Sequence, residues 1–236
     1  MLYRPPRFET PYTEKDAASL ARDLGFGTVI STLNGEICVS HLPLLIDIED
    51  DRIKRIRGHM ARANPHVGAL QESPHATVIF NGPHAYVSAQ WYTPGNPAAP
   101  SWNYVVVHVS GKVRFMPEDA AVSRIVDDLV IENEGKLPSQ WNLAGYSPER
   151  RQKLLPHIIA FEIQADRVEP KYKLNQHYAS ADKIGAARGL KSLGIERASQ
   201  IADLMLGTVK DGDGAGTGGL ESDLGLSGTP HADGRK

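Results

Sequence analysis

Strand-like runs in this chain follow one another directly, and few of them are separated by a helical pattern. Parallel strands need long crossover connections, usually helices, so this order favours an antiparallel sheet. Closing that sheet into a barrel would remove its exposed edges, and we therefore expect a mainly β fold with flanking helices. The expected strands cover residues 26–32, 36–46, 52–58, 76–81, 85–89, 103–116 and 158–168.

Helical patterns flank the strands rather than alternate with them. Thr13 is a suitable N-cap for the first helix, and Asn64-Pro65 joins a preferred N-cap to a proline at the first helical position. The expected helices cover residues 14–24, 65–72, 117–135, 148–154 and 181–205.

Turn residues mark the ends of several strands. Asn34-Gly35 suits the positive φ angles of a type I′ turn and predicts a hairpin between the first two strands. The acidic run 47–51 predicts a second turn, and Gly82-Pro83 is expected to break the strand-like run around it.

Length and composition indicate a globular chain. The 236 residues correspond to one or two domains, and residues 207–236 hold nine of the 22 glycines, which predicts a flexible tail after one domain over 1–206. No apolar run of about 18 residues is present, so we expect no membrane-spanning helix. Because the N-terminus has no signal-peptide core, we expect a cytoplasmic protein.

The charges are balanced once the tail is set apart. The tail carries three basic and five acidic residues, which leaves 23 of each kind in residues 1–206 from the 26 and 28 of the whole chain. A dedicated DNA-binding domain usually carries a net basic face. DNA therefore stays open as a partner, but the neutral charge argues against it.

Common catalytic motifs are absent from the sequence. The chain has no G-x-S-x-G, H-E-x-x-H or Walker A pattern, and its nine histidines are scattered, so no metal site is expected. Cys38 lies in an apolar strand-like run, where we expect a buried thiol rather than a nucleophile. Pro43 has no N–H to donate to a neighbouring strand, so we expect it at an edge or a bulge.

The segment GHMARANPH, residues 58–66, leaves a strand, passes through cationic residues and opens a helix. A helix N-terminus presents unpaired N–H groups and a partial positive charge, which suit a phosphate. Arg62 adds a bidentate donor, and His59 adds one more. The alternative is an ordinary capped turn between a strand and a helix.

Two aromatic segments flank a proline-rich loop. Gln90-Trp91-Tyr92 precedes the loop, and Trp102-Asn103 follows it. Aromatic rings with nearby amide groups can stack on a planar heterocycle and bind its polar edge. The alternative is a structural anchor or a dimer interface.

The segments SHLPLLID, GHMARANPH, VIFNGPHAYVSAQWY, WNYVVVHVSGKV and IAFEIQADRVEPKYKLNQ, in this order, resemble the PaiB family of FMN-binding negative transcriptional regulators. The resemblance covers about residues 1–206. It implies an FMN-binding split barrel, related to pyridoxamine-phosphate oxidases and flavin reductases. Such a barrel has six antiparallel strands in a Greek-key-like order. The resemblance also implies a homodimer with flavin at the subunit interface.

The resemblance also implies roles for particular residues. The strand through His41 should run beside the isoalloxazine ring, Arg62 and Asn64 should hold the phosphate, and the tryptophans should lie near the site. The residues expected to bind FMN are His41, Leu42, Pro43, Leu44, His59, Met60, Arg62, Ala63, Asn64, Trp91, Trp102, Asn103, Lys173 and Gln176.

Three functions follow from this resemblance. The first is a flavoprotein regulator, as the family is described. The second is an FMN-dependent oxidoreductase of a small molecule, in which the cofactor carries the electron chemistry and no classical acid or base is needed. The third is a flavin-binding module without turnover.

Overall fold

The structure is a computed structural model that describes residues 2–138, 141 and 145–209. Its strands are β1 (Phe26–Leu33), β2 (Glu36–Glu49), β3 (Arg52–Ala61), β4 (His75–Val87), β5 (Ser101–Met116) and β6 (Ile158–Lys173). Its helices are α1 (Glu14–Leu24), α2 (Pro65–Glu72), α3 (Asp119–Glu134), α4 (Pro148–Leu154), α5 (Ser180–Ser192) and α6 (Glu196–Leu206). The short 3₁₀ turns are η1 (Pro6–Phe8), η2 (Ala89–Trp91) and η4 (Leu155–His157).

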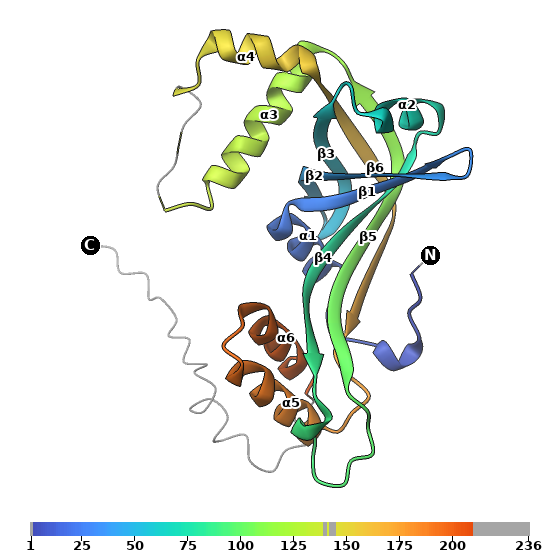
Figure 1. The fold of residues 1–236 in the computed structure, drawn as a ribbon, viewed down its shortest axis with the longest axis vertical. Helices are drawn as coiled ribbons and strands as arrows, with labels where there is room; N and C mark the ends of the chain where they lie inside the picture. Colours follow the sequence, from blue (N-terminus) through green and yellow to red (C-terminus); the bar gives the residue numbers. More distant parts are fainter. Residues whose placement is uncertain (1, 139–140, 142–144, 210–236) are drawn as a thin grey trace. The chain divides into compact units, whose positions relative to one another are not determined.

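The strands close into a six-stranded barrel in the order β1-β2-β3-β6-β5-β4 (Figure 1). The registers of β1 with β2 and β4, and of β3 with β2 and β6, are all antiparallel. Because β3 pairs with β6 rather than with β4, the connection that carries α2 crosses over, as in a Greek key. The predicted fold class is confirmed.

The chain divides by its internal contacts into two compact units. The first holds the barrel with α1 to α4, over Met1–Arg4, Tyr12–Gly82 and Val105–Tyr172. The second is built from Pro5–Pro11, Pro83–Tyr104 and the described residues from Lys173 to Val209, and it contains α5 and α6. The predicted domain boundary after residue 206 stays a prediction, and residues 210–236 of the predicted tail lie outside the described residues.

The first hairpin forms as its turn residues predict. Asn34 and Gly35 have φ angles of 52° and 86°, which a type I′ turn requires. The second turn is shorter than the acidic run 47–51, because β2 continues to Glu49 and only Asp50 and Asp51 turn, with φ angles of 50° and 61°.

Pro43 lies neither at an edge nor at the bulge of its strand. It faces Phe26 at the end of the β1–β2 register, and the next residue, Leu44, already faces Gly58 of β3. The bulge of β2 occurs farther on, between Asp47 and Ile48. Proline therefore marks the point where β2 changes its partner strand.

The expected break at Gly82-Pro83 is wrong, because β4 runs through both residues. A Cβ atom on Gly82 would lie 3.0 Å from the carbonyl oxygen of Val105 and 3.2 Å from Cδ2 of Leu20. Glycine permits this close approach of α1 and β5 to the strand, which is a packing role rather than a turn.

Other elements differ in extent from the prediction. The third strand, β3, continues to Ala61 rather than ending at residue 58, and the final strand, β6, continues to Lys173. The expected helical region 181–205 is divided into α5 and α6. The division falls at Gly194, whose φ of 65° is left-handed and ends a helix without strain.

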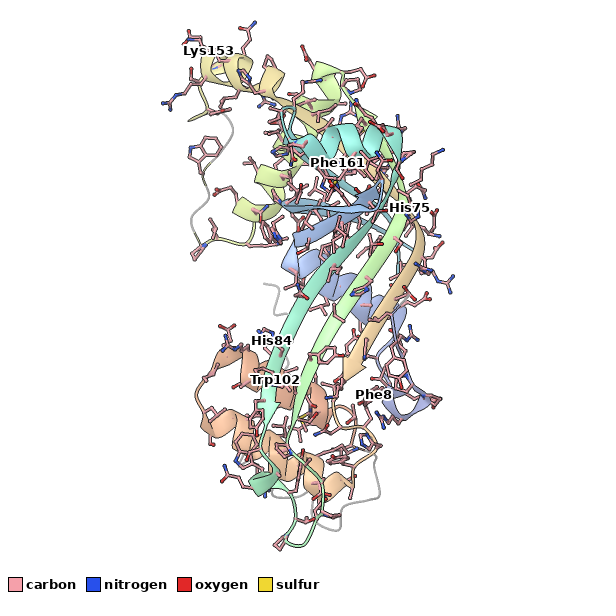
Figure 2. All side chains as sticks on the ribbon, turned by 45° about the vertical axis from the view of Figure 1, so that its right-hand side comes forward. Phe8, His75, His84, Trp102, Lys153 and Phe161 are labelled. Carbon is pink, nitrogen blue, oxygen red and sulfur yellow. The ribbon has the colours of Figure 1, made fainter. Side chains whose placement is uncertain are left out.

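The barrel interior is filled by side chains. Val29, Leu44, Phe80 and Phe161 are among its fully or almost fully buried residues, and Phe161 is labelled in Figure 2. A Cβ atom on Gly58 would lie 2.8 Å from Cδ2 of Leu44 and 3.1 Å from Cζ of Phe161. No room is left there for a cofactor, so any ligand of the barrel must bind outside it.

Candidate functional site

The turn between β3 and α2 is the most sharply defined part of the expected site. The Asn64 N–H donates to the carbonyl oxygen of Ala61 at 2.9 Å, which closes a tight turn with Arg62 and Ala63 at its corners. The Asn64 side chain caps α2 by accepting from the His66 N–H at 3.0 Å. The predicted cap and helix are therefore confirmed.

A buried polar network anchors this turn to the barrel. Asn64 Nδ2 donates to Ser40 Oγ at 3.0 Å, and Ser40 Oγ lies 2.9 Å from His66 Nδ1. The other ring nitrogen, Nε2, lies 2.9 Å from Ser31 Oγ. Burial lowers the pKa of His66, so the ring is neutral at pH 7.

The start of α2 offers fewer donors than we expected. Pro65 has no N–H, His66 donates to the Asn64 side chain, and Val67 donates to the Asn64 carbonyl oxygen at 2.9 Å. The first donors of the helix are therefore satisfied within the chain, because the cap that defines the helix uses them. An anion would therefore bind at the turn Ala61–Asn64 and not at the N-terminus of α2.

Arg62 is the cation of that turn. Its backbone N–H donates to His157 at 2.8 Å, and its side-chain Nε donates to the carbonyl oxygen of Pro156 at 3.2 Å. The side chain is exposed, and within the described part of the chain its Nη atoms and the Ala63 N–H have no hydrogen-bond partner. These groups form an exposed cluster of donors.

His59 and Met60, on β3, point to opposite faces of the strand. Met60 is 2% exposed and belongs to the barrel core, so only its backbone can reach a ligand outside. His59 faces Ala160 of β6 in the register, and its Nδ1 atom is buried without a hydrogen-bond partner among the described residues. Burial lowers the pKa of His59, which keeps its ring neutral at pH 7.

The expected flavin strand lies in β2 and also has two faces. Leu42 and Leu44 pack against the barrel core, whereas His41 is exposed and its Nδ1 lies 3.1 Å from Thr28 Oγ1. Strand alternation places His41 and Pro43 on the same face as Ile37 and Val39, which are exposed. Cys38 is half-buried in this strand rather than buried.

A charged network covers the outside of the barrel below α3. Arg57 donates two hydrogen bonds to Asp47 at 2.9 Å and one to Asp128 of α3 at 2.7 Å, and Arg55 donates to Asp47 at 2.7 Å. Burial disfavours the charge of Asp47, but the bonds from Arg57 and Arg55 outweigh it and hold the pKa below its usual range. Sequence reasoning missed this network, although the alternating arginines opposite Asp47 could have revealed it.

The exposed aromatic group of the expected site lies in the second unit. Trp102 of β5 is 55% exposed, and its ring centroid is 6.0 Å from that of His84 and 6.1 Å from that of Tyr86. His84 and Trp102 are labelled side by side in Figure 2. This cluster presents a ring surface on which a planar molecule could stack.

Trp91 and Asn103 are held inside the second unit. Trp91 packs so closely on α5 that a Cβ atom on Gly189 would overlap its ring, and one on Gly185 would overlap its carbonyl oxygen. Asn103 is fully buried, with Nδ2 donating to Met205 Sδ at 3.2 Å and Oδ1 unpartnered among the described residues. The packing of Trp91 on α5 favours the alternative that this residue is a structural anchor.

Lys173 and Gln176 also have partners within the second unit. Lys173 Nζ donates to Ser101 Oγ and to the carbonyl oxygen of Trp102. Gln176 accepts from the Leu174 N–H at 2.9 Å and donates to the carbonyl oxygen of Phe8 at 3.2 Å. Both side chains shape the ends of β5 and β6.

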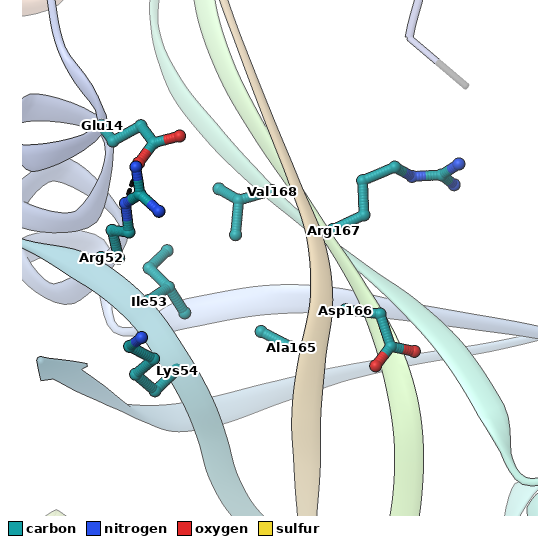
Figure 3. Close-up of a pocket in the computed structure, with 8 residues that line it drawn as sticks. All are labelled: Glu14, Arg52, Ile53, Lys54, Ala165, Asp166, Arg167 and Val168. Atoms are coloured by element: carbon teal, nitrogen blue, oxygen red, sulfur yellow. Dashed lines mark ion pairs between the residues drawn. The ribbon is translucent and has the colours of Figure 1, made fainter.

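Each unit contains a pocket lined by described residues. A pocket of about 220 Å³ opens where β3 and β6 part, with Ile53, Ala165 and Val168 beside Arg52 and Lys54 (Figure 3). A second, of about 500 Å³, lies in the other unit between residues 6–11 and the end of α6. Of the residues expected to bind FMN, only Gln176 lines either pocket.

Among the described residues, no three His, Cys, Asp or Glu side chains are grouped to hold a metal ion. Within the same ranges, no helix is long and apolar enough to cross a membrane.

The residues of the first unit fit a phosphorylated flavin outside the barrel. The filled interior excludes an internal site, while the turn offers a guanidinium and a backbone N–H to a phosphate. Such a barrel defines the class of FMN-binding split-barrel proteins.

Residues 2–167 match the family model described as "Putative FMN-binding domain", so the chain belongs to this family and FMN is its cofactor. It is 31% identical over 209 residues to "Protease synthase and sporulation protein PAI 2" of Bacillus subtilis, which covers 86% of this chain and 96% of that protein. The predicted PaiB resemblance is confirmed. An uncharacterised protein of Emericella nidulans is 29% identical over 208 residues, with 73% of this chain and 83% of that protein covered.

Solved structures give more distant likenesses. A conserved hypothetical protein of Mycobacterium tuberculosis has a TM-score of 0.49 at 11% identity and covers 75% of this chain and 94% of its own. The FAD and heme binding protein of Mycobacterium smegmatis has a TM-score of 0.48 at 14% identity and covers 68% of this chain and 71% of its own.

Proposed function

We propose that this chain is a flavoprotein regulator that binds FMN on the outside of the barrel, with the phosphate at the turn Ala61–Asn64. The observation that carries the proposal is the exposed Arg62 guanidinium beside the Ala63 N–H, both held by a turn whose other donors are used. Guanidinium groups bind phosphate with two parallel, charge-assisted hydrogen bonds. Bound FMN supplies redox chemistry that no side chain of the chain provides.

The remaining expected residues receive more limited roles. The strand His41–Leu44 contributes backbone groups, the exposed His41 side chain and the half-buried Pro43 side chain, and Met60 contributes only its backbone. The unpartnered Nδ1 atom of His59 supports a place close to the cofactor. Asn64 shapes the turn, because both ends of its amide are already engaged.

Within the second unit, the residues expected to bind FMN offer a ring surface and its support. Trp102 offers an exposed ring for stacking. Trp91, Asn103, Lys173 and Gln176 hold the segments on either side of it through the contacts described above.

A homodimer is supported by the outer face of the β1–β2 hairpin. Phe26, Ile37 and Val39 are exposed there, with Ile37 at 71%, and this face continues through His41. A row of exposed apolar side chains on two paired strands is typical of an interaction surface. A second copy docked on it would bury this row and close a flavin site at the interface.

The regulatory role rests on the family and on the Bacillus relative, which is named for protease synthesis and sporulation rather than for a reaction. The neutral body of the chain favours regulation through a partner over direct DNA contact. The alternative is an FMN-dependent oxidoreductase of a small molecule. It is favoured by the exposed His84–Trp102 pair, which joins a stacking surface to a proton donor.

One set of measurements tests these proposals. FMN titration of the purified protein should show saturable quenching of flavin fluorescence, and ultracentrifugation should show a dimer. Protein that leaves FMN fluorescence unchanged would refute the FMN site, and a monomer at all concentrations would refute the interface. A DNA shift with the salt dependence of phosphate contacts would support direct repression. Oxidation of NAD(P)H above the rate of free FMN, without such a shift, would favour the oxidoreductase.

A further inference from the structure

A polar network beside the turn Ala61–Asn64 forms a closed cycle of hydrogen bonds, which we call the hydrogen-bond ring. The His66 N–H donates to Asn64 Oδ1, Asn64 Nδ2 donates to Ser40 Oγ, and Ser40 Oγ meets the His66 ring at Nδ1. The hydrogen-bond ring joins β2 to the first turn of α2, and it has one branch, from His66 Nε2 to Ser31 of β1. Ser31, Ser40 and His66 are all buried.

The cap fixes the orientation of one amide in this network. The backbone N–H of His66 requires an oxygen at the cap, so the amide nitrogen of Asn64 must face Ser40. Ser40 Oγ therefore accepts from Asn64. It either donates to His66 Nδ1 or accepts from it, and Ser31 takes the opposite role at Nε2 of a neutral imidazole.

Among the described residues, no charged group forms a hydrogen bond or an ion pair with the His66 imidazole. The groups that face the imidazole are the hydroxyls of Ser31 from β1 and Ser40 from β2, and burial is the only cause of the shifted His66 pKa. The hydrogen-bond ring is therefore held by hydrogen bonds alone, and its geometry depends on each of Ser40, Asn64 and His66.

We propose that His66 is a positioning residue which, through Ser40, fixes the Asn64 amide and so the turn that presents Arg62 and the Ala63 N–H to the FMN phosphate. This inference rests on the proposed FMN site. The backbone N–H of Asn64 closes the turn by donating to the carbonyl oxygen of Ala61, and its side-chain amide donates to Ser40 Oγ. Loss of the Ser40 hydroxyl therefore removes a hydrogen bond that holds Asn64, the last residue of the turn, in place. His66 itself touches no ligand.

The two serines provide a matched pair of variants. Ser31 and Ser40 are 5% and 7% exposed, and each lies 2.9 Å from a His66 nitrogen, but only Ser40 contacts Asn64. Ser31→Ala leaves one imidazole nitrogen unpaired, and Ser40→Ala leaves one imidazole nitrogen and the Asn64 amide nitrogen without this partner, so both should lower the melting temperature and Ser40→Ala should lower it more. Only Ser40→Ala should change the turn.

The test combines FMN titration with hydrogen exchange of the apo protein. Ser40→Ala should raise the Kd for FMN by roughly tenfold, the effect of losing about one hydrogen bond, and Ser31→Ala by less than about twofold. In apo protein, exchange of the His66 backbone amide should accelerate by about tenfold in Ser40→Ala and stay near wild type in Ser31→Ala, since only the former loosens the cap.

A second variant covers the case in which Ser40→Ala fails to fold. Asn64→Ser keeps a preferred N-cap but is too short to reach Ser40, so the helix should persist while the link is lost. It should weaken FMN binding by roughly tenfold without a large change in melting temperature.

The outcomes distinguish failure of the positioning role from failure of the proposed FMN site. Equal FMN affinity of wild type, Ser40→Ala and Asn64→Ser would overturn the positioning role and leave the FMN site intact. Equal weakening by Ser31→Ala and Ser40→Ala would also overturn it, because the effect would then follow stability alone. Wild-type protein that binds no FMN would refute the proposed function, and the hydrogen-exchange comparison would still decide whether Ser40 holds the cap.

Discussion

Arg62 donates from Nε to the carbonyl oxygen of Pro156 at 3.2 Å, and among the described residues its two Nη atoms have no hydrogen-bond partner. An arginine held in this way has lost part of its rotamer freedom before any ligand binds. The preorganised guanidinium is therefore suited to a phosphate, because less entropy is lost for each hydrogen bond formed.

Arg62→Ala should weaken FMN binding by roughly 10- to 150-fold, the equivalent of a charge-assisted contact of about 1.5–3 kcal/mol. Fluorescence titration at fixed ionic strength measures the change. Arg22→Ala removes an exposed arginine near the end of α1 and serves as the control for overall charge. Similar affinities of the two variants would contradict a phosphate contact by Arg62.

The second prediction concerns the network that fixes α3 to the barrel. Asp47→Asn removes the negative charge and one of the two oxygens that accept from Arg55 and Arg57, whereas Asp128→Asn removes the charge that pairs with Arg57 alone, at a more exposed position. We expect losses in the free energy of unfolding of about 2–3 kcal/mol for Asp47→Asn and about 0.5–1 kcal/mol for Asp128→Asn. Urea denaturation measures both, and a larger loss for Asp128→Asn would show that the network is not centred on Asp47.

The sequence was sufficient for the local features of the fold. The Asn34-Gly35 turn and the Asn64 cap form where predicted, because each depends on the conformational preference of one or two neighbouring residues. The break expected at Gly82-Pro83 fails, since that glycine is required by the close approach of Leu20 and Val105, which are distant in the sequence. Local rules cannot show which strands and helices will meet.

The same limit applies to the candidate site. The cationic turn was predictable because Arg62 and Asn64 are neighbours in one short motif. The hydrogen-bond ring through Ser40 was not, because a serine in β2 and a histidine in α2 become partners only when the barrel closes. The expected open helix N-terminus was also wrong, since the cap and the turn use the first N–H groups of α2.

The third prediction is a loss of stability in mild acid. Burial lowers the pKa of His66 from its ordinary value near 6.5, so below about pH 6.5 the unfolded chain binds more protons than the folded chain. Folding stability is then complete above about pH 6.5 and falls as the pH decreases toward the folded-state pKa. Burial also lowers the pKa values of His59 and His108, so these two residues should likewise make the folded protein less stable as the pH decreases.

Urea unfolding at about pH 7.5 and pH 5.5 measures this effect. His66→Gln keeps a polar side chain that does not titrate, so its stability should depend less steeply on pH than that of the wild type, by up to about 1.4 kcal/mol per pH unit. An identical pH dependence of the two proteins would mean that His66 does not contribute.

The fourth prediction uses two glycines of the first unit that differ in their surroundings. A Cβ atom on Gly111 of β5 would lie 1.9 Å from the carbonyl oxygen of Gln164, whereas a Cβ atom on Gly68 of α2 would meet nothing within 4 Å. Gly111→Ala must push β6 away from β5, so we expect a loss of at least about 3 kcal/mol in the free energy of unfolding. Gly68→Ala should raise it by about 0.5–1 kcal/mol, because alanine reduces the backbone freedom of the unfolded chain. Urea midpoints at unchanged m-value measure both shifts, and a Gly111→Ala variant as stable as wild type would contradict the close contact of β5 and β6.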